Sequence, residues 1–262
     1  DKYPFDAQVH IDFSEEFTIL YQGEKTRITR DWSIWNRRIF PLEFPDCFPR
    51  NLEEMVREER KQTLQGIMRA HQGLVVNPPE DNLRADNKIE QLQRAKVIGL
   101  AIPETVITND PEKAKEFYEK HEGNIIFKMQ KLPLVTDGEE TKTILTQRVT
   151  PKFFYDRIDR ISNLPCCFQE RVEKEYEIRL TIIGEQDFPI AIYSQDSEYS
   201  KDDFRRYDFE KVKYKLVEIP KKLSQKVHQL MDAYGLHYAS IDIIRTPTGE
   251  YVFLEINPNG QY

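Results

Sequence analysis

The sequence predicts a fold of the α+β or α/β class, in which helices and strands pack in layers. Short alternating runs of apolar and polar residues predict strands and a hairpin within residues 5–30. Segments with helical spacing and capping residues follow from about residue 51. The chain closes on two apolar runs, "YASIDIIRT" and "EYVFLEIN", which Pro247-Thr248-Gly249 joins as the turn of an antiparallel hairpin.

The predicted helices begin at residues that can cap a helix. Asn51 is expected to be the N-cap of the first long helix, with Glu54 completing a capping box. Asp86 is expected to cap the next helix. Asp110 and Pro111 form an N-cap and first-turn pair for a helix over residues 111–121.

The strands between these helices are short and apolar, and glycines mark two helix ends. Gly99 and Gly235 are the expected C-terminal caps of the helices before them. Strands are expected in "GNIIFKMQ", "PCCFQERV", "EIRLTIIG" and "FPIAIYS". A long polar loop, "QDSEYSKDDFRRYDFEKVKYK", precedes the last helix.

Composition excludes several classes of protein. The 262 residues carry a net charge of −7, so there is no global positive field for nucleic acid. Three cysteines, with Cys166 and Cys167 adjacent, do not form a disulfide framework, which favours a reducing, cytoplasmic setting. No signal peptide is visible, and no apolar run approaches the roughly 18 residues of a membrane span.

The closing strand holds the sharpest chemical signal. Glu255 and Asn257 are two residues apart in an apolar strand, so their side chains share a face. A buried glutamate is costly unless it is paired or binds a metal, and such oxygens suit Mg²⁺ shared with a phosphate. A strand end whose polar groups reach water explains the stretch equally well. Asp242 on the neighbouring strand could supply a third oxygen ligand.

Two lysines are candidates for binding phosphate. Lys128 ends the apolar strand "NIIFKM", where a lysine either extends to the surface or reaches a phosphate. Lys88 lies at a helix start, where the helix dipole disfavours a cation and makes a bound anion more plausible.

The stretch "FQERVEKEYEIRLTIIG" offers groups for a nucleotide. The backbone around Glu170 and Val172 is extended and can face the edge of an adenine, and Glu177 can accept bonds from ribose hydroxyls. Arg179 shares the face of Glu177 and can bind phosphate oxygens. Taken residue by residue, a charged hairpin that faces water is the commoner outcome.

These features together, over residues 80–262, resemble the ATP-grasp superfamily. Within it the chain is most similar to the microviridin-type, or graspetide, peptide-macrocyclising ligases. Three motifs carry that similarity: "FLEINPNGQY" with Gln261, "DDFRRYD" with Asp203, Arg205 and Arg206, and "WSIWNRRI" with Trp35, Arg37 and Arg38. The arginine of "DDFRRYD" also resembles that of ligases that add glutamate to ribosomal protein tails.

The resemblance implies a role for each matching residue. Lys88 and Lys128 would hold ATP phosphates, Glu170 and Val172 would contact adenine, and Glu177 would bind ribose. Asp242, Glu255 and Asn257 would hold Mg²⁺. Arg179 and Arg205 would be catalytic, at the phosphate and acyl groups, and Asp203 and Arg206 would contact the peptide more weakly.

The resemblance also implies a domain plan. Residues 1–80 would form part of an N-terminal domain, residues 81–168 a central subdomain and residues 169–262 a C-terminal subdomain with the Mg²⁺ site. A first β-α unit and a C-terminal helix of the family are not found in the sequence. The phosphate-covering loop is expected near residues 131–142, where "KLPLVTDGEE" has only one glycine.

The implied reaction uses ATP and Mg²⁺ to activate Asp or Glu side chains of a ribosomal precursor peptide and to close ω-ester rings with Thr or Ser. Its leader segment would dock near the helix 111–121 and the strands 124–150, although a solvated charged face is the default reading of that helix. A homodimer is possible. Two alternatives stay open: a ligase that forms ω-amides or adds amino acids to a protein tail, and an ATP-binding regulatory protein without turnover. His237 is more plausibly structural than a general base.

Overall fold

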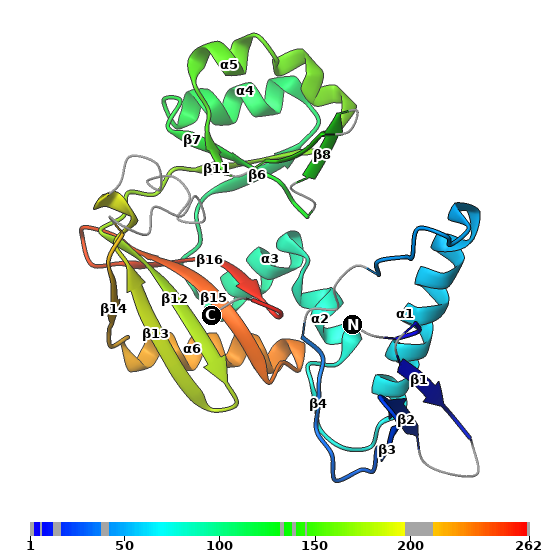
Figure 1. Cartoon of the computed structure of the whole chain (residues 1–262). Helices are drawn as coiled ribbons and strands as arrows, with labels where there is room; N and C mark the ends of the chain where they lie inside the picture. The colour runs from blue at the N-terminus through cyan, green and yellow to red at the C-terminus, as the bar shows by residue number, and fades with distance from the viewer. Residues whose placement is uncertain are drawn as a thin grey trace. The chain divides into compact units, whose positions relative to one another are not determined.

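The structure is a computed structural model, and it describes residues 3–5, 7–12, 17–37, 42–131, 134–137, 140–144, 146–196 and 212–260. Contacts within it divide the chain into two units (Figure 1). The first unit combines Asp1–Leu83 with Gly235–Tyr238, and the second combines Arg84–Tyr234 with Ala239–Tyr262. Both units mix helices with strands, which confirms the predicted fold class.

The first unit begins with the predicted N-terminal strands. They form an antiparallel sheet in the order β1-β2-β3, with bounds Ala7–His10, Thr18–Tyr21 and Glu24–Arg27. A parallel pair follows, β4 (Ile34–Trp35) with β5 (Val75–Val76). The helices of this region are η1 (Arg50–Leu52), α1 (Glu53–Ala70) and α2 (Pro79–Ala85).

The expected capping box of α1 is wrong. Pro49 begins a 3₁₀ turn that includes Asn51, so the N-cap position of α1 falls on Leu52, which has no side-chain capping bond. Because Asn51 already lies inside a helical turn, its side chain is not at the extended position that N-cap geometry requires.

The second unit contains two sheets. One is four-stranded in the order β10-β7-β11-β6, with bounds Gln147–Arg148, Ile125–Lys128, Cys166–Glu170 and Thr105–Thr108. Helices α4 (Pro111–Lys120) and α5 (Pro151–Tyr155) lie on one face of it (Figure 1). Their shared core contains Ala114, Phe117, Tyr118, Ile125, Val149, Phe154, Ile161 and Phe168.

The other sheet is five-stranded in the order β14-β13-β12-β15-β16. Its bounds are Tyr214–Leu216, Gln186–Ile192, Tyr176–Ile183, Tyr238–Arg245 and Tyr251–Asn257. The last two strands form the predicted antiparallel closing hairpin. Helix α6 (Lys221–Tyr234) lies across one face of this sheet, and α3 (Lys88–Ile98) packs beside α6 and β16 (Figure 1). Smaller elements are β8 (Leu134–Asp137), β9 (Glu140–Thr143), η2 (Ile158–Asn163) and η3 (Ser194–Asp196).

Helix α3 fixes Lys88 at its first residue, but its cap differs by one residue from the expected one. Asn87, not Asp86, accepts hydrogen bonds from the backbone N–H groups of Ile89 and Glu90, each at 3.1 Å. The extended backbone of Asn87 places its side chain over the first turn. Gly99 ends this helix with φ = 84°, as predicted.

Helix α3 is tied to the last strand by one buried glutamine. Gln91 donates from Nε2 to the carbonyl of Ile256 at 3.0 Å, and its Oε1 accepts from the N–H of Ile256 at 3.1 Å. β16 is the edge strand of its sheet, and these two bonds take the place of hydrogen bonds to a further strand. They hold the strand directly beside Glu255 and Asn257.

Two further expectations concern chain-wide features. No helix in the described part of the chain is both long and apolar enough to cross a membrane. The three cysteines are free, as expected, with Cys167 buried and Cys47 exposed.

Candidate active site

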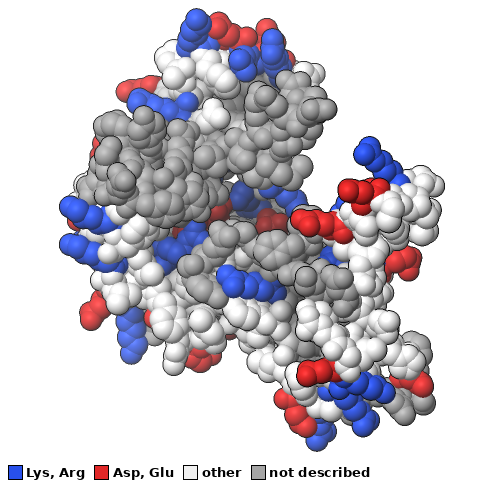
Figure 2. All heavy atoms as spheres, in the orientation of Figure 1, with Lys and Arg blue, Asp and Glu red and all other residues white. Residues whose placement is uncertain are grey.

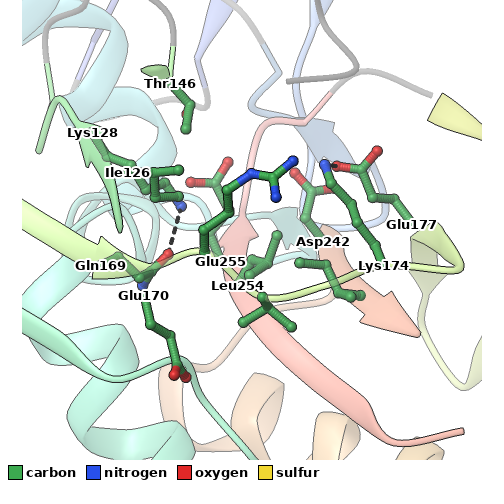
Figure 3. A pocket seen from close by; sticks show the side chains of 13 residues that line it. Ile126, Lys128, Thr146, Gln169, Glu170, Lys174, Glu177, Asp242, Leu254 and Glu255 are labelled. Carbon is green, nitrogen blue, oxygen red and sulfur yellow. Dashed lines mark hydrogen bonds and ion pairs between the residues drawn. The ribbon is translucent and has the colours of Figure 1, made fainter. Parts of the chain in front are cut away.

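An open pocket lies between the two sheets of the second unit, with about 590 Å³ of empty space (Figure 3). Strands β7 and β11 supply one wall, and β12, β15 and β16 supply the other. Its lining consists of Ile126, Lys128, Thr146, Gln169, Glu170, Arg171, Val172, Lys174, Glu177, Asp242, Ile244, Leu254 and Glu255. Of the nine predicted site residues that the structure describes, six belong to this lining: Lys128, Glu170, Val172, Glu177, Asp242 and Glu255. The other three, Lys88, Arg179 and Asn257, contact the carboxylates of Asp242 or Glu255.

The two carboxylates proposed as metal ligands lie side by side. Asp242 on β15 is directly opposite Glu255 on β16, and each residue is 7% exposed. The register shifts between Asp242 and Ile243, which leaves Leu254 as an extra residue in β16. Bulges of this kind redirect side chains next to active sites. Here Leu254 and Glu255 consecutively line the pocket.

Basic groups neutralise both carboxylates. Lys88 Nζ lies 2.6 Å from Glu255 Oε2. Arg179 Nε lies 2.8 Å from Asp242 Oδ1, but its N–H is not aligned for a hydrogen bond to that oxygen, whereas Nη2 donates to Oδ2 at 3.4 Å. Two like charges opposite each other on a sheet are unfavourable without such counter-charges.

Asn257 belongs to the same cluster, as its spacing from Glu255 predicted. Its Nδ2 donates to Glu255 Oε1 at 3.2 Å. With the amide nitrogen directed to Glu255, the amide oxygen is the atom left to face a cation. The three predicted oxygen ligands therefore form one cluster, of which Asp242 and Glu255 line the pocket.

On the opposite wall, Lys128 is held by a short chain of polar groups. Its Nζ donates to Gln169 Oε1 at 3.5 Å (Figure 3). Gln169 Nε2 donates to Thr105 Oγ1 at 2.9 Å. Thr105 in turn donates its hydroxyl proton to the carbonyl of Pro103 at 2.9 Å. This direction of donation leaves the amide oxygen of Gln169 facing Lys128.

A buried cysteine lies beside Lys128. Cys167 on β11 is directly opposite Lys128 on β7 in the antiparallel ladder. Burial raises the pKa of the Cys167 thiol, while the positive charges of Lys128 and Lys88 act in the opposite direction.

Residues 170–172 form a hinge between the two walls, and all three line the pocket. Glu170 points its carboxylate away from the pocket, where Oε1 accepts from the N–H of Glu104 at 2.8 Å (Figure 3). Arg171 is tied through its backbone N–H to the carbonyl of Asn124 at 3.0 Å. Among the described residues, Val172 makes no backbone hydrogen bond. Its N–H and C=O suit the edge of a planar base.

Glu177 carries a buried carboxylate with an open acceptor. Lys174 Nζ donates to its Oε1 at 2.9 Å, and both side chains are 8% exposed. Within the described part of the chain, its Oε2 has no hydrogen-bond partner. A buried orphan oxygen at the pocket wall is matched by a donor such as a sugar hydroxyl.

The donor set fits a nucleotide with a divalent cation. The cluster of Asp242, Glu255 and Asn257 offers two carboxylates and an amide oxygen, which are oxygen ligands that suit Mg²⁺. Lys88, Lys128 and Arg179 are available to bind phosphates. Figure 2 shows acidic and basic side chains next to one another on the face in view.

Several residues singled out from the sequence lie outside the described residues. They are Arg38, Asp203, Arg205, Arg206 and Gln261. Trp35 and Arg37 belong to the first unit, where the Arg37 guanidinium lies 5.2 Å from the centre of the Trp35 ring.

Sequence reasoning missed Gln169 and Lys174 as pocket residues. Gln169 directly precedes Glu170 in the sequence, but nothing in a single sequence shows that its amide faces Lys128. Lys174 and Glu177 have the spacing of a charged pair in a solvated hairpin, and only their burial separates them from one.

No family model matches the sequence, and no curated protein matches it. Several solved structures are similar to this chain. The macrocyclase MdnC from Microcystis aeruginosa MRC, bound with its precursor peptide MdnA, is 31% identical, with 100% of this chain and 82% of that chain covered at a TM-score of 0.86. The chain belongs to the graspetide-type ATP-grasp ligases.

Two further solved structures share this fold. A RiPP-associated ATP-grasp ligase from Chryseobacterium gregarium, in complex with ADP and a leader and core peptide, is 28% identical. The matched region covers 99% of this chain and 79% of the Chryseobacterium gregarium chain, at a TM-score of 0.89. The ATP-grasp ligase PsnB, complexed with a phosphomimetic variant of its minimal precursor, Mg and ADP, is 21% identical. The matched region covers 99% of this chain and 79% of the PsnB chain, at a TM-score of 0.72. This likeness supports the fold alone.

Proposed function

We propose that this graspetide-type ligase uses ATP to close ω-ester macrocycles within a ribosomally made precursor peptide. The observation that carries the proposal is the pocket itself, in which an oxygen-ligand cluster on β15 and β16 lies across from Lys128 and the hinge backbone. Two similar proteins, MdnC and the Chryseobacterium gregarium ligase, were solved with their peptides bound, which makes a peptide the favoured acceptor.

The nucleotide half of the pocket follows from the groups that line it. Lys88 and Lys128 bind the phosphates of ATP, as lysines commonly do. Adenine lies against the hinge, where the backbone of Glu170 and Val172 supplies its edge contacts. Glu177 accepts a ribose hydroxyl on Oε2.

Asp242, Glu255 and Asn257 hold Mg²⁺. The bound ion supplies charge neutralisation for the triphosphate. The buried position of the two carboxylates strengthens this effect, because charges interact more strongly away from water.

The reaction has two steps. An Asp or Glu carboxylate oxygen of the peptide attacks the γ-phosphorus of ATP, ADP leaves, and an acyl phosphate forms. A Thr or Ser hydroxyl of the same peptide then attacks the acyl carbon. Phosphate leaves with the electron pair of the broken C–O bond, and the hydroxyl proton passes to solvent or to the phosphate. Holding both peptide groups in one site lowers the barrier, by up to about 7–11 kcal/mol for ideal alignment.

From β12, Arg179 faces the phosphate and acyl groups of the reacting centre, where it binds phosphate oxygens and stabilises the oxyanion of the second step. We assign the same role to Arg205, which lies outside the described residues. Asp203 and Arg206 contact the peptide. The leader segment docks on the central region formed by residues 111–121 and 124–150, within a plan of three domains at 1–80, 81–168 and 169–262.

The decisive experiment is intact-mass spectrometry of peptides with a Thr-, Glu- and Asp-rich core, incubated with the full chain, ATP and Mg²⁺. Loss of one water per ring is expected with the native protein and not with Glu255→Gln. Glu185→Gln, in the exposed turn after β12, is the matched control and retains activity. Hydroxylamine then cleaves esters and spares amides.

The same experiment separates the alternatives. Rings that resist hydroxylamine would replace the ester by an ω-amide. A gain of residue mass on an acceptor would identify a ligase that adds amino acids to a protein tail. ATP binding with neither change, across the set of peptides, would contradict the proposed cyclisation and favour a regulatory protein without turnover.

A further inference from the structure

Both acidic metal ligands of the pocket already have a basic partner. Lys88 contacts Glu255 at 2.6 Å, and Arg179 contacts Asp242 at 2.8 Å. The four side chains are mostly buried, with exposures of 23% for Lys88, 9% for Glu255, 14% for Arg179 and 10% for Asp242. These are the same basic groups that the proposed function assigns to phosphate.

The pairing has a physical cause. Asp242 and Glu255 are neighbours across the β15–β16 ladder, so each carboxylate feels the repulsion of the other as well as the loss of water. Removing one partner from a buried ion pair leaves an uncompensated charge, which is strongly unfavourable. Cations must therefore occupy this end of the pocket whether or not a metal is bound.

We propose that Lys88 and Arg179 act as placeholder counter-ions. They hold Glu255 and Asp242 in position in the nucleotide-free protein, and then transfer to the phosphates of ATP when the metal takes their place. This inference rests on the proposed function, because it uses the assignment of the pocket to ATP and Mg²⁺. It adds a positioning role that precedes catalysis.

The exchange makes metal and nucleotide depend on each other. A metal ion alone must displace Lys88 from Glu255 and leave that ammonium without a carboxylate. A nucleotide offers the displaced lysine and arginine new anionic partners. Metal and nucleotide therefore bind with positive coupling, and by linkage each raises the affinity of the other by the same factor.

The proposal predicts opposite signs for one substitution. Lys88→Met removes a phosphate ligand, so the affinity for ATP falls. It also frees Glu255 from its counter-ion, so the affinity of the nucleotide-free protein for a divalent cation rises. A lysine that served only as a phosphate ligand would produce the first effect alone.

Lys128 provides the matched control. It lines the pocket, and its Nζ donates a hydrogen bond to the neutral amide of Gln169 at 3.5 Å. Lys128→Met is expected to weaken ATP binding while it changes divalent-cation affinity much less. This comparison separates release of a carboxylate from a general loss of positive charge.

The test measures Mn²⁺ binding to the full chain without nucleotide, by the electron paramagnetic resonance signal of the free ion. Lys88→Met is expected to bind Mn²⁺ at least about fivefold more tightly than the native chain, the lower end of typical coupling between sites. Arg179→Met should shift affinity in the same direction, and Glu255→Gln should abolish tight binding. Lys88→Gln, which keeps a donor without the charge, decides the matter if Lys88→Met does not fold.

The outcomes separate this proposal from the proposed function. Unchanged or weaker Mn²⁺ binding in Lys88→Met, or a gain equal to that of Lys128→Met, would overturn the placeholder role while Mn²⁺ and ATP still bind to the native chain. Failure of the native chain to bind ATP in the presence of Mg²⁺ would instead overturn the function on which the proposal rests.

Discussion

Gly260 is expected to be essential for the metal end of the pocket because of close packing. A Cβ added at Gly260 would lie 2.4 Å from Ser240 Cβ and 2.7 Å from Ser240 Oγ, whereas ordinary contacts are 3.4–4 Å. Gly260 donates its N–H to the carbonyl of Asn257 at 3.1 Å, so the loop cannot move away without disturbing Asn257.

The Gly260→Ala variant must therefore shift either β15 or the loop by about 1 Å, the difference between these distances. Overpacking of this kind costs about 1–3 kcal/mol of stability. A displacement of about 1 Å in a catalytic group can cost roughly a hundredfold in rate. We expect a lower melting temperature. We also expect the binding of ATP with Mg²⁺ to weaken at least about tenfold, because a loss of about 1–2 kcal/mol corresponds to roughly that change in affinity.

Isothermal titration of ATP in the presence of Mg²⁺, with thermal unfolding beside it, measures both effects. Ser240→Gly removes both Ser240 atoms that the new Cβ would contact. Gly260→Ala should therefore weaken binding much less in the Ser240→Gly background than in the native chain. Gly66→Ala is the control, because a Cβ there meets nothing within 4 Å. The reasoning is refuted if Gly260→Ala binds like the native chain, or if Ser240→Gly does not relieve it.

Three further predictions concern single side chains. Glu177→Gln should weaken ATP binding by about 10- to 100-fold, which is the scale of a hydrogen bond to a charged group. Binding of 2′,3′-dideoxy-ATP, which lacks the ribose hydroxyls, should weaken much less. Equal losses for the two nucleotides would contradict a ribose contact. Gln169→Leu should weaken ATP binding, and combining it with Lys128→Met should add little, because both changes remove one interaction; full additivity would contradict their coupling. Burial, with the Glu90 carboxylate as a smaller cause, raises the pKa of Tyr234 to about 12. Since unfolded tyrosine ionises near 10, the stability present below pH 10 should fall toward pH 12, by on the order of 1–3 kcal/mol. Tyr234→Phe should flatten this loss in urea unfolding at each pH; an unchanged pH profile would exclude Tyr234 as its source.

Much of the fold could be predicted from local sequence. The alternation of "YVFLEIN" placed Glu255 and Asn257 on one face of a strand, and the structure joins their side chains at 3.2 Å. Asp110 caps α4 as predicted, through a bond from the N–H of Glu112. The predicted cap of α3 was one residue off, because Asp86 and Asn87 are locally equivalent until the backbone turns. The predicted cap of α1 was wrong because a 3₁₀ turn over Arg50–Leu52 precedes the helix and includes Asn51.

The details of the site depended on contacts distant in sequence. Nothing local predicts that the carboxylate of Glu170 leaves the pocket for the N–H of Glu104, or that the amide of Gln169 is held by Thr105. The burial that distinguishes Lys174 and Glu177 from a solvated pair is likewise produced by the packing of other strands.

The sequence by itself determined which residues carry oxygen ligands and positive charge, and which of them share a strand face. Those properties depend on residue type and on the two-residue period of a strand, and both are local. Only the tertiary structure decided the pairing of Lys88 with Glu255, 167 residues apart, and of Arg179 with Asp242. Charges interact according to their distance and burial in space, and the path of the chain between them sets both.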